Sequence, residues 1–182
     1  ILSRMRIKIS HYPAWDEEIQ VETWPRGIER LFALRDFRLF SKSGKLLAKA
    51  TTCWLMVDMN THRPLRIGQD FIPIELRKDS VFRTTPEKIS LPPEMNICNE
   101  RKVHYSDLDV VGHVNNVKYI EWCTDALDPL MFLKSGVAEL EMNYMSEAKI
   151  GDDIHLHCSE ILDGSVLING SHKVDAKECF RA

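Results

Sequence analysis

The chain has 182 residues, of which 44% are hydrophobic and 28% are charged, and its formal net charge is −3. This balance is typical of a folded globular protein and excludes disorder, and the length is sufficient for one large domain or two small ones. No apolar run approaches the roughly 20 residues that a membrane helix needs, and an acidic chain is poorly suited to neutralise phosphates. We therefore expect no membrane and no nucleic-acid partner.

The cysteines are widely spaced and odd in number, and none has the spacing of a metal ligand: Cys53, Cys98, Cys123, Cys158 and Cys179. This pattern predicts reduced thiols in a reducing compartment and no metal site, and we expect a cytoplasmic protein. The sequence shows no signal or transit peptide. It begins with Ile1 rather than Met, directly on a predicted strand, so we expect an N-terminal piece to be missing.

In the first part of the chain, alternating apolar and polar residues predict strands over 1–10, 15–24, 30–42 and 45–59. The sequence KSGK predicts a tight turn between the last two strands. Residues 62–97 then carry charged residues and five prolines: Pro64, Pro73, Pro86, Pro92 and Pro93. This composition predicts a surface linker, with a short helix near PIELRKD.

The second part is predicted to contain a strand at 98–106, a helix at about 113–127, and strands at 137–147, 153–161, 164–174 and 178–182. Its pattern repeats the first part: a shift of 135 residues lays EEIQVETW on DDIHLHCS and LFALRDFR on VLINGSHK, and a shift of 132 lays SGKLLAKA on DAKECFRA. The second copy has a leading strand and helix that the first lacks, and we expect its C-terminus to be clipped.

One helix and repeated antiparallel strands predict an α+β layer arrangement. The repeat divides the chain into a partial N-terminal copy at 1–61, a linker at 62–97 and a C-terminal copy at 98–182.

The stretch YSDLDVVGHVNNVKYIEW, Tyr105 to Trp122, places more hydrogen-bonding side chains before a helix than capping requires. A helix start leaves unpaired backbone N–H groups with partial positive charge, which can stabilise an oxyanion. Val111 and Gly112 are predicted to supply such amides, and Gly112 allows a ligand to approach the backbone closely.

The segment SDLDVVGHVNNVKYIEW resembles the strand-to-helix segment of plant and bacterial acyl-ACP thioesterases, within the hotdog-fold thioesterases. The blocks LSRMRIKISHYPAWDEEIQVETW and LEMNYMSEAKIGDD are also similar to the family and stand in its order, so the likeness covers nearly the whole chain outside the linker. The resemblance implies a double hotdog, in which an antiparallel sheet wraps a long helix twice in one chain. The site then lies only in the second copy.

Residue by residue, the resemblance implies that Asp109 is the catalytic aspartate, which activates water or attacks the thioester itself; a plain helix N-cap is the alternative. It implies that His113 binds and orients the acid or the water, with a proton shuttle as a further role, and that Glu147 completes the network. The counterpart of Glu147 in the first copy is Tyr12, so the resemblance implies a single site. Asn115 either hydrogen-bonds near the site or serves the first turn of the helix.

Other residues near the motif are given structural roles. Asp107 is predicted to be a turn or capping residue, and Cys123 a core residue. Val117, Ile120 and Trp122 are the predicted buried stripe of the helix.

Two positions depart from the family pattern. Val111 stands where the family usually has Asn, which removes one side-chain donor. Either Asn115 or a backbone amide takes over this contact, or the enzyme is slow, since loss of one such donor costs about 10²–10³ in rate in comparable sites. Ala148 stands where plant members often have Cys, so a thiol nucleophile at this position is excluded.

The resemblance implies hydrolysis of fatty acyl thioesters of acyl carrier protein to free fatty acid, in fatty acid biosynthesis, without cofactor or metal. This partner is acidic, so we expect a basic docking patch at Arg77, Lys78 and Arg83, with a solvated linker as the alternative. An acyl-CoA thioesterase of the 4-hydroxybenzoyl-CoA type and a non-catalytic acyl-binding hotdog protein stay open as functions. The acyl chain length, the choice between Asp109 as nucleophile and as base, and a homodimer are also left open.

Overall fold

The structure is a computed structural model that describes every residue except 62, 69–75 and 78. Its residues form two compact units. Unit 1 comprises Ile1–Lys88 and Val137–Glu141, and unit 2 comprises Ile89–Gly136 and Met142–Ala182. The predicted division at 61 and 98 follows the sequence repeat rather than compactness, and it stays a prediction. The short helix predicted at PIELRKD falls largely outside the described residues.

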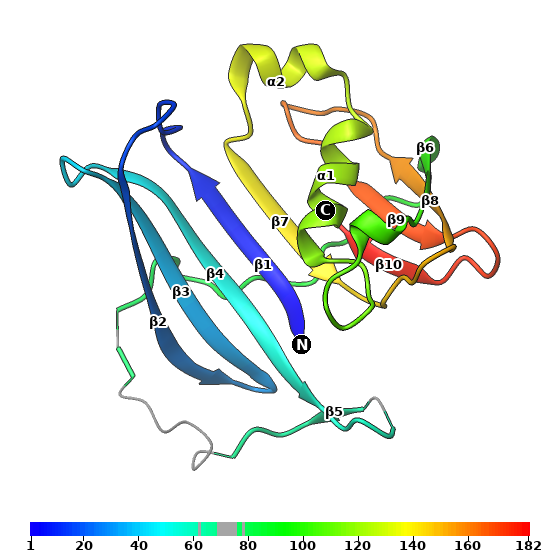
Figure 1. The fold of residues 1–182 in the computed structure, drawn as a ribbon, viewed down its shortest axis with the longest axis horizontal. Coiled ribbons are helices and arrows are strands. Elements are labelled where there is room, and N and C mark those ends of the chain that lie inside the picture. Colours follow the sequence, from blue (N-terminus) through cyan, green and yellow to red (C-terminus); the bar gives the residue numbers. More distant parts are fainter. Residues whose placement is uncertain (62, 69–75, 78) are drawn as a thin grey trace. The chain divides into compact units, whose positions relative to one another are not determined.

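Unit 1 is built on an antiparallel sheet in the order β2-β3-β4-β1, to which the first residues of β7 belong. Its strands are β1 (Leu2–Ile9), β2 (Ile19–Glu29), β3 (Phe32–Ser41), β4 (Leu46–Val57) and the short β5 (Pro64–Leu65). The predicted turn joins β3 to β4, where Gly44 adopts a positive φ of 82°. The four long predicted strands are thus confirmed (Figure 1).

Unit 2 contains the helices and a second antiparallel set in the order β7-β10-β9-β8-β6. Its elements are β6 (Asn96–Lys102), a 3-10 turn (Tyr105–Asp107), α1 (Asn116–Asp125), α2 (Pro129–Ser135), β7 (Glu139–Tyr144), β8 (Asp153–Cys158), β9 (Ile168–His172) and β10 (Glu178–Arg181). The predicted helix at 113–127 is shorter than expected, because its chain enters through an irregular loop. Helix α2 was not predicted; Asp128 caps it and Pro129 begins it.

The strands of the two units repeat one order, which confirms the predicted duplication. A shift of 135 residues places β1 on β7, β2 on β8 and β3 on β9, and the 132-residue shift places β4 on β10. Unit 1 reads β2-β3-β4-β1, and unit 2 reads β8-β9-β10-β7 in the same sense. Among the described residues, α-helices occur only in unit 2, and none of them is long and apolar enough to cross a membrane.

Helix α1 lies against the unit 2 sheet (Figure 1), and aromatic side chains make the contact. The ring of Tyr119 lies 5.1 Å from that of Phe180 on β10 and 6.0 Å from that of Tyr144 on β7, measured between centroids. Tyr119, Trp122 and Cys123 form the buried face of the helix, at i, i+3 and i+4. Val117, predicted to be buried, is 57% exposed, because it lies two positions before Tyr119 and therefore points to another side of the helix.

The expectation of five reduced thiols is wrong, because Cys98 and Cys158 form a disulfide. These cysteines are 60 residues apart in sequence but lie on the paired strands β6 and β8, with their Cα atoms 5.7 Å apart. Strand pairing, which the cysteine spacing does not reveal, brings them within bonding range. Cys53, Cys123 and Cys179 are free and buried.

Gly170 on β9 leaves room for the ring of Phe180, its partner on β10. A Cβ at Gly170 would lie 2.1 Å from Phe180 Cε1, and Phe180 is fully buried. We expect Gly170→Ala to lower the free energy of unfolding by about 1–3 kcal/mol, because the added methyl overpacks the core. Urea unfolding measures this loss. Gly164→Ala is unsuitable as a control, since Gly164 has a positive φ; Ser165→Ala in the adjoining exposed turn should cost much less.

Residues 79–88, which we call the strap, lie in the predicted linker but pack onto unit 1. Val81 and Phe82 are buried, each 8% exposed, and cluster with Trp24 of β2. The Phe82 ring also lies beneath the cations of Arg6 and Lys49, 4.7 Å and 4.6 Å from its centroid. The linker therefore contributes to the core rather than only crossing the surface.

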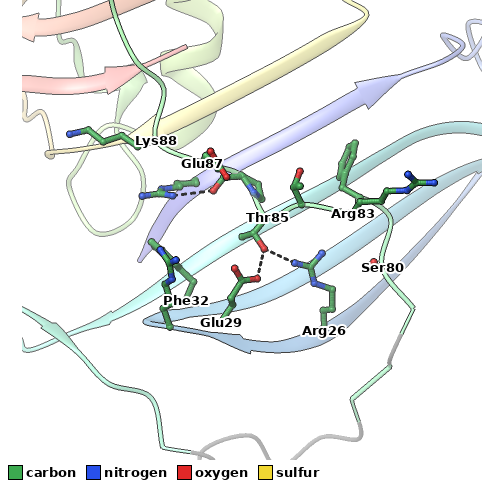
Figure 2. A pocket seen from close by; sticks show the side chains of 13 residues that line it. Arg26, Glu29, Phe32, Ser80, Arg83, Thr85, Glu87 and Lys88 are labelled. Carbon is green, nitrogen blue, oxygen red and sulfur yellow. Dashed lines mark hydrogen bonds between the residues drawn. The ribbon is translucent and has the colours of Figure 1, made fainter.

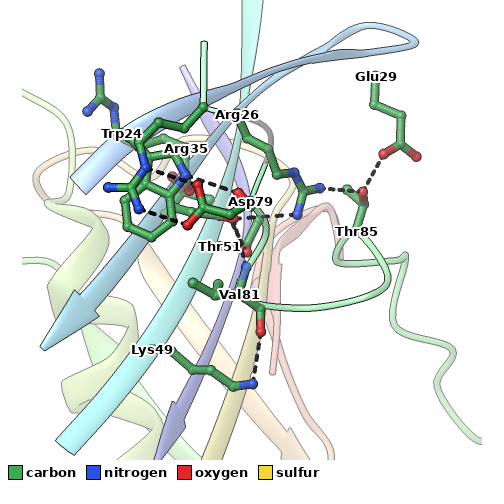
Figure 3. Close-up of polar contacts among 12 residues, drawn as sticks. Trp24, Arg26, Glu29, Arg35, Lys49, Thr51, Asp79, Val81 and Thr85 are labelled. Carbon is green, nitrogen blue, oxygen red and sulfur yellow. Dashed lines mark hydrogen bonds and ion pairs between the residues drawn. The ribbon is translucent and has the colours of Figure 1, made fainter. Parts of the chain in front are cut away.

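Polar contacts fasten the strap to the sheet (Figure 3). The buried carboxylate of Asp36 accepts the Val81 N–H at 3.0 Å, and the Lys49 ammonium donates to the Val81 carbonyl at 2.8 Å. Arg26 donates to the Thr85 hydroxyl at 3.0 Å. These contacts come from β2, β3 and β4, so the strap is held by three strands.

Candidate active site

The motif after β6 folds into a closed loop before α1 begins. Leu108 and Val114 pair across its base. Inside it, Asp109 N–H donates to the His113 carbonyl at 2.9 Å and Gly112 N–H donates to the Asp109 carbonyl at 3.1 Å. Gly112 has a φ of 84°, which favours glycine, and nothing lies within 4 Å of where its Cβ would be. The loop therefore presents an open backbone surface.

The carboxylate of Asp109 is held by backbone amides of the same loop. Its Oδ1 accepts the N–H of Val111 at 2.9 Å and that of His113 at 3.3 Å. Val111 and Gly112 do not stand at the helix start, because α1 begins only at Asn116. Their amides are engaged by Asp109 in this structure, so an oxyanion role for them requires the loop hydrogen bonds to rearrange.

Helix α1 has its own cap, which separates Asp109 from a capping role. The side chain of Asn115 accepts the Val117 N–H at 3.0 Å, so Asn115 serves the first turn of the helix, one of its two predicted roles. Asp107 is the predicted turn and capping residue: its carboxylate accepts the His104 N–H at 2.8 Å, and its carbonyl accepts the Asn115 N–H at 2.9 Å. Asp109 lies between these two capped turns and caps neither.

His113 and Glu147, 34 positions apart by number, meet at this loop. His113 Nε2 lies 3.3 Å from Glu147 Oε2, and the two side chains are 30% and 48% exposed. Backbone pairing fixes their approach, because Val114 N–H donates to the Ala148 carbonyl at 3.0 Å. Of the three residues predicted to be catalytic, Asp109 and His113 lie on this loop, and Glu147, from the segment that follows β7, pairs directly with His113.

Tyr119 supports this pair from α1, a contact that the sequence did not reveal. Its hydroxyl accepts the Ala148 N–H at 3.2 Å, one residue after Glu147. Burial raises the pKa of Tyr119 well above its usual range, so the phenol stays neutral. In the sequence, only its position six residues after His113 in the motif could have pointed to Tyr119. The contact with Ala148 is visible only in the fold.

Removing this hydroxyl tests its hydrogen bond with the Ala148 amide. We expect Tyr119→Phe to retain the ring contacts but to leave the buried Ala148 N–H without its acceptor, at a cost of about 1–3 kcal/mol in the free energy of unfolding. Thermal and urea unfolding measure this cost. Tyr105→Phe is the matched control, because Tyr105 is 82% exposed and its change should leave stability unaltered. Equal stability of both variants would contradict the assignment.

The two residues that depart from the family pattern, Val111 and Ala148, differ in their exposure. Val111 is 72% exposed and Ala148 is fully buried, so the missing Asn side chain would have stood on the open side of the loop. Burial raises the pKa of the Cys123 thiol to about 12, which keeps it protonated and unreactive near neutral pH. Cys123 is therefore a core residue, as predicted.

The position equivalent to Glu147 in unit 1 has a structural role. The Tyr12 hydroxyl accepts the Val137 N–H at 2.8 Å and donates to the Val137 carbonyl at 2.9 Å. No acid stands there, in keeping with one site in the second copy. Within the described residues, no group of three or more His, Cys, Asp or Glu side chains could hold a metal ion.

The docking patch predicted at Arg77, Lys78 and Arg83 is only partly described. Arg77 stacks on Trp24, 3.9 Å from the ring centroid, and forms two hydrogen bonds with Asp79. The hydrogen bond from Arg77 lowers the pKa of Asp79. Lys78 lies outside the described residues, and Arg83 lies in the strap with its side chain exposed.

Comparison with known proteins identifies the fold. The Bacteroides thetaiotaomicron acyl-ACP thioesterase structure covers 100% of this chain, with a TM-score of 0.89 and 26% identity, over 73% of its own length. A 12:0-ACP thioesterase from Umbellularia californica, at 18% identity, has a TM-score of 0.85 and covers all of this chain and 72% of its own. A Mycobacterium tuberculosis protein described as a double hotdog aligns over the whole chain and 73% of its own length, with a TM-score of 0.57 and 10% identity. The predicted α+β double hotdog is thereby confirmed.

Sequence comparison gives the family. A palmitoyl-acyl carrier protein thioesterase of Gossypium hirsutum is 30% identical over 156 residues, and an oleoyl-acyl carrier protein thioesterase of Arabidopsis thaliana is 28% identical over 169. The alignments take in 81% and 84% of this chain but only 38% and 45% of those proteins. The family models "Acyl-ACP thioesterase N-terminal domain" and "Acyl-ACP thioesterase C-terminal domain" match residues 1–74 and 91–178. The chain belongs to the acyl-ACP thioesterase family.

Proposed function

We propose that the protein hydrolyses the thioester of a fatty acyl group on acyl carrier protein, releasing free fatty acid and the carrier thiol. The observation that carries this proposal is that Glu147 pairs with His113, which lies on the same loop as the Asp109 carboxylate. The family and the names of the relatives, which are acyl carrier protein thioesterases, support the choice of substrate.

In the proposed reaction, Asp109 either removes a proton from water or attacks the thioester carbonyl itself. His113 hydrogen-bonds the acid or the water, and Glu147 holds the imidazole and stabilises it when it carries a proton. The carbon–sulfur bond breaks, and the sulfur leaves as a thiol with a proton that comes from water. Where Asp109 is the nucleophile, water then cleaves the acyl–aspartate anhydride, which releases the free acid and restores the carboxylate.

The loop hydrogen bonds suggest how an oxyanion could be stabilised. When Asp109 Oδ1 turns toward water or substrate, it gives up the Val111 N–H that it holds at 2.9 Å. That amide is then able to donate to the developing oxyanion, and Gly112 leaves the approach open. The same movement therefore frees the Asp109 carboxylate for catalysis and the Val111 amide for the oxyanion.

A second function is favoured by one observation. Val111 provides no side-chain donor, and the loop amides are engaged within the loop, so a hotdog protein that binds acyl chains without hydrolysis is the alternative. An acyl-CoA thioesterase of the 4-hydroxybenzoyl-CoA type would share the catalytic aspartate, but the double hotdog in one chain disfavours it.

The experiment is release of free acid from a panel of acyl-ACPs with matching acyl-CoAs beside them, using the full-length protein. Faster turnover of acyl-ACP supports the proposal and reveals the preferred chain length. Faster turnover of acyl-CoA moves the protein to the CoA class. Hydrolysis of neither substrate, before and after Val111→Asn, would leave acyl binding as the function.

A further inference from the structure

Unit 1 contains a cleft of about 780 Å³ between the strap and the sheet (Figure 2). Its basic lining residues outnumber its acidic ones: Arg4, Arg26, Arg30, Arg83 and Lys88 against Glu29 and Glu87. This excess is unusual in a chain whose formal net charge is −3. The cleft therefore concentrates positive potential on an acidic protein.

Two of the five cations are fixed in place by the protein itself. Arg4 donates to the Pro86 carbonyl at 3.1 Å and stacks on Phe32, 4.9 Å from its centroid. Arg26 donates to Thr85, whose hydroxyl in turn donates to Glu29 at 2.5 Å, and it also faces the buried Asp36. These contacts hold the strap, so Arg4 and Arg26 shape the walls of the cleft.

The other three cations have no charged or hydrogen-bonding partner among the described residues. The side chains of Arg30, Arg83 and Lys88 are exposed and form no ion pair or hydrogen bond with any residue that the structure describes. Figure 2 shows Arg83 and Lys88 toward opposite ends of the row of lining side chains. Three exposed and unpaired cations in an open cleft suit a broad acidic surface better than a small anion.

We propose that Arg30, Arg83 and Lys88 form the docking surface for the acidic carrier protein. This inference rests on the proposed function, because that function supplies an acidic partner. It replaces the patch expected from the sequence, since Asp79 engages Arg77 and only Arg83 is shared by the two sets. The cations speed the encounter with the carrier and thereby lower KM.

The test compares the full chain with the triple variant Arg30→Ser, Arg83→Ser, Lys88→Ser. We expect kcat/KM for acyl-ACP to fall about tenfold or more through KM and to lose most of its salt dependence. Turnover of the matching acyl-pantetheine, which has no carrier surface, should not change. The dissociation constant for holo-ACP, measured by calorimetry, should rise by a similar factor.

The matched control is Lys8→Ser, Lys45→Ser, Lys177→Ser, which removes the same charge from three exposed lysines outside the cleft. Wild-type binding of holo-ACP by the cleft variant, or an equal loss in the control, would overturn the proposal. Competition by inorganic pyrophosphate at the cleft with unchanged holo-ACP binding would also overturn it, in favour of a small-anion site. Because holo-ACP binding is measured directly, absence of hydrolysis would defeat the proposed function and still leave docking testable.

Discussion

Asp109→Asn is expected to lower kcat for acyl-ACP by about 10²–10⁴-fold, the usual contribution of a positioned general base, with little change in stability. Asparagine keeps an oxygen that can accept the Val111 and His113 amides, which Asp109 Oδ1 holds at 2.9 Å and 3.3 Å. It cannot accept a proton from water or attack a thioester. The substitution therefore separates the chemical role of Asp109 from its role in the loop.

Steady-state kinetics on acyl-ACP, with urea unfolding in parallel, measure the two roles. Asp107→Asn is the matched control, because Asp107 is also an aspartate of the motif but engages the His104 amide. We expect that control to retain turnover. A comparable loss in both variants would mean that the motif needs acidic residues only for its fold, and full activity in Asp109→Asn would exclude Asp109 as base or nucleophile.

Most of the fold could be predicted because strand alternation and the repeat are local patterns. The four long strands of unit 1 follow from the periodicity of apolar residues, and the duplication follows from the repeat of that pattern. Contacts between distant residues could not be predicted in the same way. The Cys98–Cys158 disulfide depends on the pairing of β6 with β8, and the buried Val81 and Phe82 depend on a linker that returns to its own sheet.

In the site, too, local patterns could be predicted and contacts between distant residues could not. The motif placed Asp109 and His113 on one loop, and the family block placed Glu147 near them. The start of α1 at Asn116 was missed, because Asn115 and Asp107 compete with Asp109 as caps and all three are good capping residues. The support of the Glu147 segment by Tyr119 could not be seen either, since it needs α1 and the segment after β7 to be packed together.

Asp36→Ala is expected to cause the largest loss of stability in unit 1, about 3–5 kcal/mol, because it breaks a buried ion pair on one side only. Asp36 is fully buried; its carboxylate lies 3.7 Å from Arg26 Nη1 and accepts the Thr51 hydroxyl at 2.6 Å. Alanine would leave the largely buried Arg26 guanidinium without its counter-charge. It would also leave the Val81 N–H without the acceptor that it has at 3.0 Å.

Because these contacts hold the strap, Asp36→Ala should loosen the strap locally as well as lower the stability of the whole protein. Urea unfolding measures the global effect, and hydrogen exchange at the Val81 amide should lose protection first. The control is Glu18→Ala, which breaks the exposed Lys42–Glu18 pair and should alter neither measurement. Arg26→Ala combined with Asp36→Ala should cost less than the sum of the single changes, since it removes both charges. Additive losses, or unchanged exchange at Val81, would show that the Asp36–Arg26 pair does not hold the strap, and the walls of the docking cleft would then need another support.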